Sequence, residues 1–175
     1  MPTNYAKFDQ ERYDKFDGIA KDALVSYLKQ EGHAIKRVKE DYLADVVSTK
    51  EGETFYSEAE VKASWKGQWP ENWKDLRIPG RKVRLLQKQA TITFFVFRGD
   101  LQECWIVRGD QLSLDNLKQA YGAKITKGEM FFHIPVTEAK LIRYDENGWA
   151  QVVQEDAGVS GSSGATEDGE AETLP

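Results

Sequence analysis

The chain has 175 residues, with 24 Lys and Arg against 29 Asp and Glu and a net charge of −5 at pH 7. This length is enough for one domain with a proper hydrophobic core. No uninterrupted apolar stretch approaches the roughly 20 residues of a membrane helix, and the first residues lack the apolar segment of a signal peptide. The single cysteine, Cys104, excludes an internal disulfide and is typical of a reducing cytosol. We therefore expect a cytoplasmic protein that does not contact membranes.

The acidic charge is concentrated at the C-terminus. From Glu155 onward the chain contains six acids and no Lys or Arg, among many Gly, Ser and Ala residues. Such a composition cannot bury enough apolar surface to order itself, so residues 151–175 are expected to form a disordered tail after a folded domain at 1–150. Without those six acids the chain has 23 acidic and 24 basic residues, so the domain is close to neutral.

The first predicted element is an amphipathic helix from Lys15 to Glu31, ended by Gly32. Its apolar residues recur at helical spacing and form one stripe that is expected to be buried. The stripe consists of Phe16, Ile19, Ala20, Ala23, Leu24, Tyr27 and Leu28. Asp17 lies at the border of this stripe, and Asp22 lies nearly opposite it. A solvated helix face explains both acids.

Residues 43–62 are the most informative segment. Thr49 to Glu53 has the composition of a turn, with Gly52 able to adopt positive φ, and the flanks resemble strands, so we expect a β-hairpin with a three- to five-residue loop. A fold-back near Gly52 places Asp45 across from Glu58 or Glu60, with Cβ atoms roughly 4.5–5.5 Å apart. Two carboxylates that close repel unless a cation lies between them. Oxygen ligands of this kind suit Mg²⁺ or Mn²⁺.

The second strand of this hairpin has two faces, because side chains alternate along a strand. The expected core face carries Phe55, Ser57, Ala59, Val61 and Ala63, and the other face carries Tyr56, Glu58, Glu60 and Lys62. The charged face could be the solvated side of an antiparallel sheet. The arrival of a third acid, Asp45, and the like charges of Glu58 and Glu60 favour a metal site instead.

A basic segment follows the hairpin. Residues 62–88 contain eight Lys or Arg and two acids, which is the local charge that a phosphodiester substrate requires. Within it, Trp65, Trp69 and Trp73 occur at four-residue spacing, but Gly and Pro residues favour a loop with a short helical turn over a continuous helix. The tryptophans could stack on bases while the cations bind phosphates. They could equally form a small core that braces the loop, and we favour this for Trp69 and Trp73.

The remainder of the chain is expected to be scaffold. Strands are predicted at 90–97 and 103–108, joined by a hairpin turn at Arg98–Leu101. A short helix is predicted at 111–121, with Ser113 as N-cap and Gly122 at its end. A further strand is expected at 129–135, and residues 136–143 form a short helix or a strand that ends the domain.

An acid at the head of one strand, followed by Glu-x-Lys on the next and preceded by an amphipathic helix, resembles the core of the PD-(D/E)xK nuclease superfamily. The order is similar to that of archaeal Holliday-junction resolvases and many phage and restriction nucleases. The resemblance covers roughly residues 11–100, and Ala44 stands at the loosely kept proline position. It implies an α/β fold with a restriction-endonuclease-like core, in which helices flank a mixed central sheet.

The resemblance also implies an activity, the Mg²⁺- or Mn²⁺-dependent hydrolysis of DNA phosphodiester bonds. Asp45 and Glu60, with the backbone carbonyl of Val61, would bind the metal. Lys62 would orient the attacking water, and Glu58 would hold a second ion or act as a base. The expected substrate-binding residues are Lys66, Trp73, Arg77, Arg81, Lys82 and Arg84.

Several points stay open after this resemblance. Many members contribute an acid from the helix, and neither Asp17 nor Asp22 fits that role convincingly. Many relatives act as dimers, and a phage-infected or bacterial cell is the expected host. The alternatives are a catalytically inactive nuclease-fold protein that binds nucleic acid or a protein partner, and a protein–protein adaptor whose acidic tail mimics nucleic acid.

Overall fold

The protein was studied as a computed structural model, which describes residues 10–38, 44–88, 92–120, 125 and 127–153. Its helices are α1 (Gln10–Gln30) and α2 (Val83–Lys88), with short 3-10 turns at Gly80–Lys82, Gly109–Gln111, Leu114–Asn116 and Val136–Glu138. Its strands are β1 (Ala34–Val38), β2 (Val46–Lys50), β3 (Glu53–Lys62), β4 (Asp75–Pro79), β5 (Ile92–Arg98), β6 (Glu103–Arg108), β7 (Leu117–Gln119), β8 (Met130–Pro135), β9 (Lys140–Asp145) and β10 (Gly148–Gln151).

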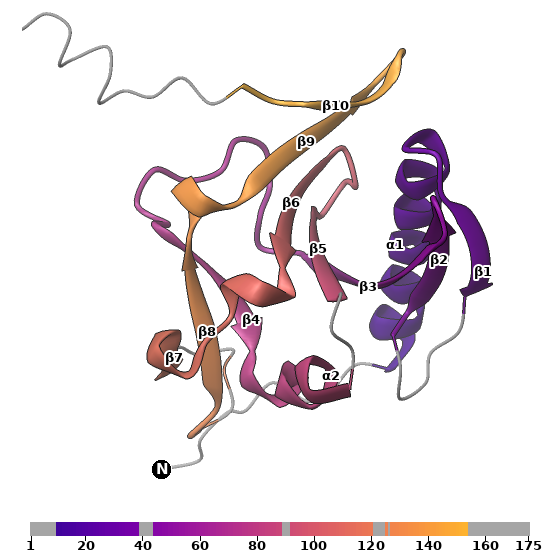
Figure 1. Cartoon of the computed structure of the whole chain (residues 1–175). Coiled ribbons are helices and arrows are strands. Elements are labelled where there is room, and N and C mark those ends of the chain that lie inside the picture. Colours follow the sequence, from indigo (N-terminus) through magenta and orange to yellow (C-terminus); the bar gives the residue numbers. More distant parts are fainter. Residues whose placement is uncertain (1–9, 39–43, 89–91, 121–124, 126, 154–175) are drawn as a thin grey trace, which may run out of the picture.

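Seven of these strands form one mixed sheet in the order β1-β2-β3-β5-β6-β9-β10. Every neighbouring pair is antiparallel except β3 and β5, which run parallel. A parallel pair requires a long connection, and here it passes through β4 and α2. Figure 1 shows that the sheet curls strongly, with α1 beside β1, β2 and β3. The β9–β10 hairpin packs against the end of α1, where the Gln30 side chain makes two hydrogen bonds with the backbone of Trp149.

Helix α1 covers one face of this sheet, which we call the helix face. Leu24, Tyr27 and Leu28 are buried there against Val46, Phe95 and other apolar residues of the sheet. The predicted stripe is thus confirmed in most positions, although Ile19 is exposed (37%). The helix stops before Gly32, whose φ of 90° suits glycine.

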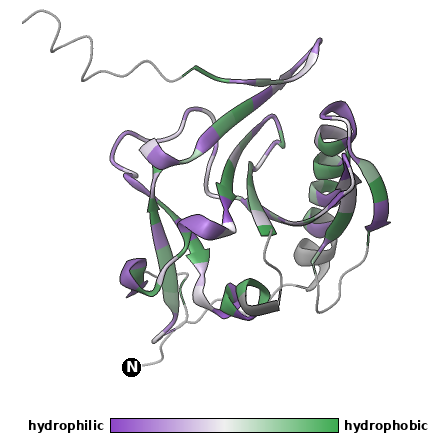
Figure 2. Cartoon of the chain, viewed as in Figure 1, coloured by the Kyte–Doolittle hydropathy of each residue, from purple (hydrophilic) through white to green (hydrophobic). Residues whose placement is uncertain are grey.

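The opposite face is covered by a second, three-stranded sheet in the order β4-β8-β7, and we call it the small-sheet face. Leu76 and Ile78 of β4 and Phe132 and Ile134 of β8 pack there in a core shared with β5 and β6. Figure 2 shows hydrophobic residues concentrated in these central strands, while the region around β7 is hydrophilic. The α/β prediction is therefore confirmed, but strands rather than helices cover most of this second face.

The tryptophans of the loop before β4 belong to this second core. Trp65 is fully buried, its ring lies 5.1 Å from that of Trp69, and the Trp69 ring lies 5.0 Å from that of Trp73. Trp105 of β6 packs against both Trp65 and Trp69. The three loop tryptophans therefore form the small bracing core that the sequence favoured for two of them.

The β2–β3 hairpin is confirmed, but its loop is shorter than predicted. Lys50 pairs with Glu53, so only Glu51 and Gly52 form the turn. Both have positive φ, 51° and 81°, as in the tight turns whose twist matches that of the strands. The expected loop of three to five residues is therefore wrong, because Glu51 also adopts the left-handed conformation.

The helix predicted at 111–121 is also wrong. Ser113 caps a 3-10 turn, and its backbone N–H donates a hydrogen bond to Asn116 Oδ1 at 3.1 Å. The chain then continues as β7, in which Leu117 pairs with Phe132 of β8. Gly122 lies outside the described residues. Pairing with β8 thus overrides the local helical signal, whereas the strands predicted at 90–97, 103–108 and 129–135 are present.

Among the described residues, neither helix combines the length and hydrophobicity needed to cross a membrane. Strand β10 is the last element of the described structure. Val152, directly after it, donates a backbone hydrogen bond to the carbonyl of Leu141. The acidic tail from residue 154 onward lies outside the described residues.

Candidate active site

Asp45 and Glu58 lie directly opposite each other at the start of the β2–β3 hairpin. Because Val46 pairs with Ser57, the register brings Asp45 to Glu58. The Asp45 N–H donates to the Glu58 carboxylate at 3.2 Å, and the Ala59 N–H donates to Asp45 Oδ2 at 2.9 Å. Both side chains are buried, at 7% and 8% exposure. The structure thus brings two carboxyl groups together away from bulk water.

The two carboxyl groups of this pair have very different affinities for protons. Burial, together with the hydrogen bond and the charge of Glu58, raises the pKa of Asp45 from 3.8 to about 8. Burial also acts to raise the pKa of Glu58, but its hydrogen bond to Asp45 and the ammonium of Lys82 outweigh it and lower that pKa. At neutral pH the pair therefore shares one proton, held by Asp45.

Two ammonium groups flank the pair from opposite sides. Lys82, in the 3-10 turn before α2, forms an ion pair of 3.0 Å with Glu58. Lys21 of α1 is buried, lies 3.8 Å from Asp45 Oδ1 and is held at 2.8 Å by Asp17. Asp17 therefore reaches the site through Lys21, while Asp22 is exposed. Apart from the i,i+4 spacing between Lys21 and Asp17, no sequence pattern predicts Lys21 at this site.

Glu60 and Lys62 continue from Glu58 along the same face of β3, the small-sheet face. Successive residues on one face of a strand are about 6–7 Å apart, so Glu60 is the acid nearest to the pair along β3. Its side chain is exposed to water. Desolvation by the surrounding protein nevertheless raises the pKa of its carboxyl, while the positive charges of Lys82, Arg81 and Lys62 act to lower that pKa. Direct contact with water limits that rise. We call Asp45, Glu58 and Glu60 the carboxylate cluster.

Lys62 lies against Trp73 rather than in an ion pair. Its Nζ is 5.0 Å from the centre of the Trp73 ring, and no acid among the described residues lies within 4 Å of it. Burial lowers the pKa of Lys62. The negative charge of Glu60 acts to raise that pKa, and the positive charge of Arg77 acts to lower it further. A partly buried lysine with a lowered pKa beside acids is a common feature of active sites.

A cavity of about 340 Å³ extends from Lys62. Trp73 forms part of its lining, and Lys74 and Arg77 add two further cations against the single acid Asp75. Arg77 is exposed on β4, where it pairs with His133 across the strands. Of the expected substrate-binding residues, Trp73 and Arg77 therefore lie beside Lys62.

Of the other expected substrate-binding residues, Lys82 contacts Glu58 and Arg81 acts electrostatically on Glu60. Arg81 is exposed and forms an ion pair of 3.1 Å with Glu129, and Arg84 is exposed on α2. Lys66 is exposed in the tryptophan loop. The side chain of Val61 packs on the helix face, as the alternation along β3 requires.

The carboxylate cluster can be tested as a metal site by the chemistry of its donors. No group of three His, Cys, Asp or Glu residues in the described parts of the chain is arranged to hold a metal ion. However, Mg²⁺ keeps several waters and is commonly bound by only one or two carboxylates together with substrate phosphates. Asp45 and Glu58 supply two neighbouring carboxyl groups, and this donor set suits such an ion.

Comparison with known proteins adds no assignment to this geometry. No protein-family model matches the chain, and no curated protein is similar to it in sequence.

Proposed function

We propose that this protein is a Mg²⁺-dependent endonuclease that hydrolyses DNA phosphodiester bonds. The observation that carries the proposal is the buried pair of Asp45 and Glu58, which face each other across β2 and β3 and are followed on the same face of β3 by Glu60. Buried acids that must share a proton are poised to bind a cation when one is available.

The order of the elements supports a restriction-endonuclease-like core. A helix (α1) precedes a three-stranded antiparallel meander (β1, β2, β3), and a second helix (α2) leads to β5, which pairs in parallel with β3. The acids lie at the start of β2 and on β3, as in the superfamily that the sequence resembles. Lys62 follows Glu60 at the spacing of the Glu-x-Lys motif.

In this proposal Asp45 and Glu58 would hold the metal, and Glu60 would supply a further oxygen. When bound, Mg²⁺ would lower the pKa of a water and offset charge on the scissile phosphate. Lys62, whose pKa is lowered, orients the attacking water and donates a hydrogen bond to it. Lys82 and Arg81 bind the phosphates on either side of the cleaved bond, and Arg81 can do so with a bidentate contact.

The test is nicking of supercoiled plasmid DNA in Mg²⁺. Wild-type protein is expected to nick it, and the Glu58→Gln, Glu60→Gln and Lys62→Met variants are expected to lose at least about 100-fold in rate. Glu53→Gln is the matched control, because Glu53 is an exposed acid at the far end of β3. Absence of nicking by folded wild-type protein in both Mg²⁺ and Mn²⁺ would refute the nuclease, as would full activity in the Glu58 and Glu60 variants.

A second function is favoured by the ion pairs at the site. Lys82 and Lys21 already compensate Glu58 and Asp45, as in a nuclease-like domain that binds nucleic acid without cleaving it. The described cations Lys62, Lys74, Arg77 and Arg81 would then bind the phosphate backbone. Salt-sensitive DNA binding without cleavage is the expected result for this alternative.

A further inference from the structure

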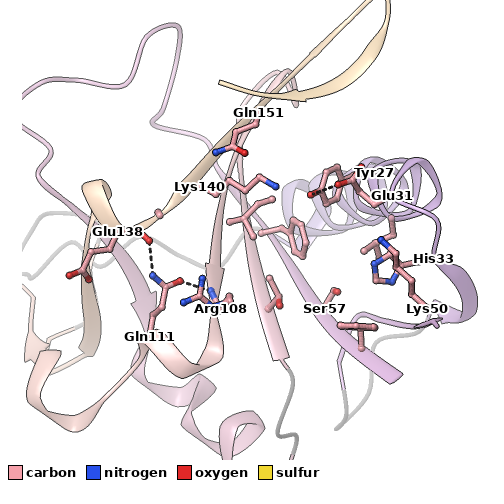
Figure 3. A pocket seen from close by; sticks show the side chains of 16 residues that line it. Tyr27, Glu31, His33, Lys50, Ser57, Arg108, Gln111, Glu138, Lys140 and Gln151 are labelled. Atoms are coloured by element: carbon pink, nitrogen blue, oxygen red, sulfur yellow. Dashed lines mark hydrogen bonds between the residues drawn. The ribbon is translucent and has the colours of Figure 1, made fainter. Parts of the chain in front are cut away.

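A second cavity, of about 420 Å³, opens on the helix face, on the side of β3 opposite to Glu58 and Glu60. We call it the helix-face pocket. It lies between the C-terminal half of α1, the hairpin β2–β3 and the strands β5, β6 and β9 (Figure 3). Its volume is in the range of small-molecule sites. None of the residues proposed for DNA hydrolysis lines it.

The floor of the helix-face pocket is apolar and largely aromatic. Phe55 of β3, Phe95 of β5 and Ile106 of β6 contribute to it, and Tyr27 and Leu28 of α1 form a wall. Tyr27 and Phe95 pack with ring centres 5.7 Å apart. Side chains of this kind bury the flat, apolar part of a ligand and leave little room for a hydrated one.

Two ammonium groups enter the pocket without an acidic partner. Lys50 of β2 and Lys140 of β9 are both half-buried, and no acid among the described residues lies within 4 Å of either. The carbon chain of Lys50 passes close to Gly32, with Cε 3.7 Å from where a Cβ would stand. In Figure 3, Lys140 extends from the β9 side toward Tyr27, while Lys50 lies on the side of β2.

Among the described residues, half-buried Lys62 also has no acidic partner, but it lies against the ring of Trp73. Several other shielded cations have an acidic partner. Lys21, Lys82 and Arg98 each have limited exposure, and each forms an ion pair with an acid. Shielding an ammonium group from water without an opposite charge costs free energy. Lys50 and Lys140 therefore have unused capacity to bind an anion that enters the pocket.

The acids of the helix-face pocket do not supply that anion. Glu31 is exposed and accepts a hydrogen bond from the Tyr27 hydroxyl at 3.4 Å, and Glu138 is exposed at the rim. Arg108 at the rim is already paired with Asp110. The inner part of the pocket is thus positive over an aromatic floor.

We propose that the helix-face pocket binds a small organic anion with a flat, apolar body. The flat body lies on Phe55, Phe95 and Ile106, and Lys50 and Lys140 bind the anionic group. Aromatic carboxylates or sulfonates and nucleoside monophosphates share this chemistry. The assignment does not depend on the proposed nuclease activity, because the pocket and the carboxylate cluster lie on opposite faces of the sheet.

The test is calorimetric titration of the full chain with two probes, naphthalene-2-sulfonate and 2′-deoxyadenosine 5′-monophosphate. We expect saturable binding of at least one probe below about 1 mM, and an affinity about tenfold lower for its uncharged counterpart, naphthalene-2-methanol or deoxyadenosine. The probe that binds more tightly distinguishes an aromatic acid from a nucleotide.

Variants then identify the cations involved. Lys50→Gln and Lys140→Gln are each expected to weaken binding about tenfold. Lys36→Gln is the matched control, because Lys36 is an exposed lysine on β1 that does not line the pocket. Amide chemical shifts of wild-type protein are expected to change at Ser57 and Thr93, two polar residues that line the pocket. These wild-type shifts keep the test independent of how well the variants fold.

The proposal would be overturned by absence of saturable binding of both probes, or by unchanged affinity in both pocket lysine variants. Shifts confined to Lys62 and Trp73 would also overturn it, because they would locate the anion in the cavity on the small-sheet face. An equal loss in the Lys36 variant would show general charge attraction and no specific site.

Discussion

The raised pKa of Asp45 should make the stability of the protein depend on pH. The pKa of Asp45 is raised from 3.8 in the unfolded chain to about 8 in the folded protein. A group whose pKa is raised on folding contributes its full stability below the unfolded pKa and loses it as the pH rises through the folded pKa. Asp45 should therefore make the protein less stable as the pH increases from about 4 to about 8, in the absence of divalent ions.

Replacement of Asp45 by Asn removes this dependence and keeps the shape of the side chain. The Asn oxygen can still accept from the Ala59 N–H, and its amide can donate to Glu58. Between about pH 5 and pH 7 the folded wild type holds one more proton than the unfolded chain, which corresponds to a slope of about 1.4 kcal/mol per pH unit. The Asp45→Asn variant should thus gain up to about 3 kcal/mol over wild type across this interval. Glu58, whose pKa is lowered, is ionised in both states there and does not contribute.

The assay is urea denaturation of both proteins at several pH values in EDTA, followed by the same series in Mg²⁺. The stability difference between the two proteins should grow with pH in EDTA, and Mg²⁺ should stabilise wild type more than the variant. Asp115→Asn, at an exposed position in a 3-10 turn, is the control and should show no such trend. A difference that stays constant from pH 5 to pH 7 would show that Asp45 does not hold the proton, and would remove the main support for the metal site.

Three further predictions concern the fold and are measured by chemical denaturation. Gly52→Ala should lower the free energy of unfolding by about 1 kcal/mol, because φ is 81°. Gly18→Ala should raise it by up to about 1 kcal/mol, because Gly18 lies within α1 and a Cβ there meets no neighbouring atom. The same sign for both variants would contradict this account of the turn. Trp65→Ala should cost about 3–5 kcal/mol, since Trp65 is fully buried in the second core, and a loss below about 1 kcal/mol would show that the tryptophan loop does not support the domain. Glu103→Gln should cost about 3 kcal/mol, because this buried carboxylate is paired with Arg98 at 3.1 Å and with Arg143 at 2.8 Å; a neutral result would show that neither arginine depends on Glu103 for compensation.

The sequence predicted those elements whose structure depends mainly on residues within the element itself. Helix α1 follows from the apolar stripe and Gly32, and the β2–β3 hairpin follows from Gly52 between two strand-like runs. The same reasoning placed Asp45 opposite Glu58 or Glu60, and the two-residue turn in the structure selects Glu58. The acidic pair was therefore within reach of sequence reasoning.

Elements that depend on distant partners were not predictable in this way. Strand β4 contains the alternating pair Leu76 and Ile78, but it ends at Pro79 and its partner β8 lies more than 50 residues away, with Ile78 opposite Phe132. The parallel pairing of β3 with β5 has no local signature either. Lys21 lies beside Asp45 because α1 packs next to the start of β2. No pattern within α1 predicts that packing.

The parallel pairing of β3 with β5 also determines when the surroundings of Asp45 and Glu58 are completed during synthesis. The hairpin that carries Asp45 and Glu58 joins neighbours in the chain and can fold as soon as it leaves the ribosome, whereas Lys82 and strand β5 emerge later. Closing such a distant contact is slow compared with forming a hairpin. During that interval Glu58 lacks its ion pair with Lys82, whereas Lys21 of α1 has already emerged and can compensate Asp45. The arrival of Lys82 then completes the charge balance of the pair.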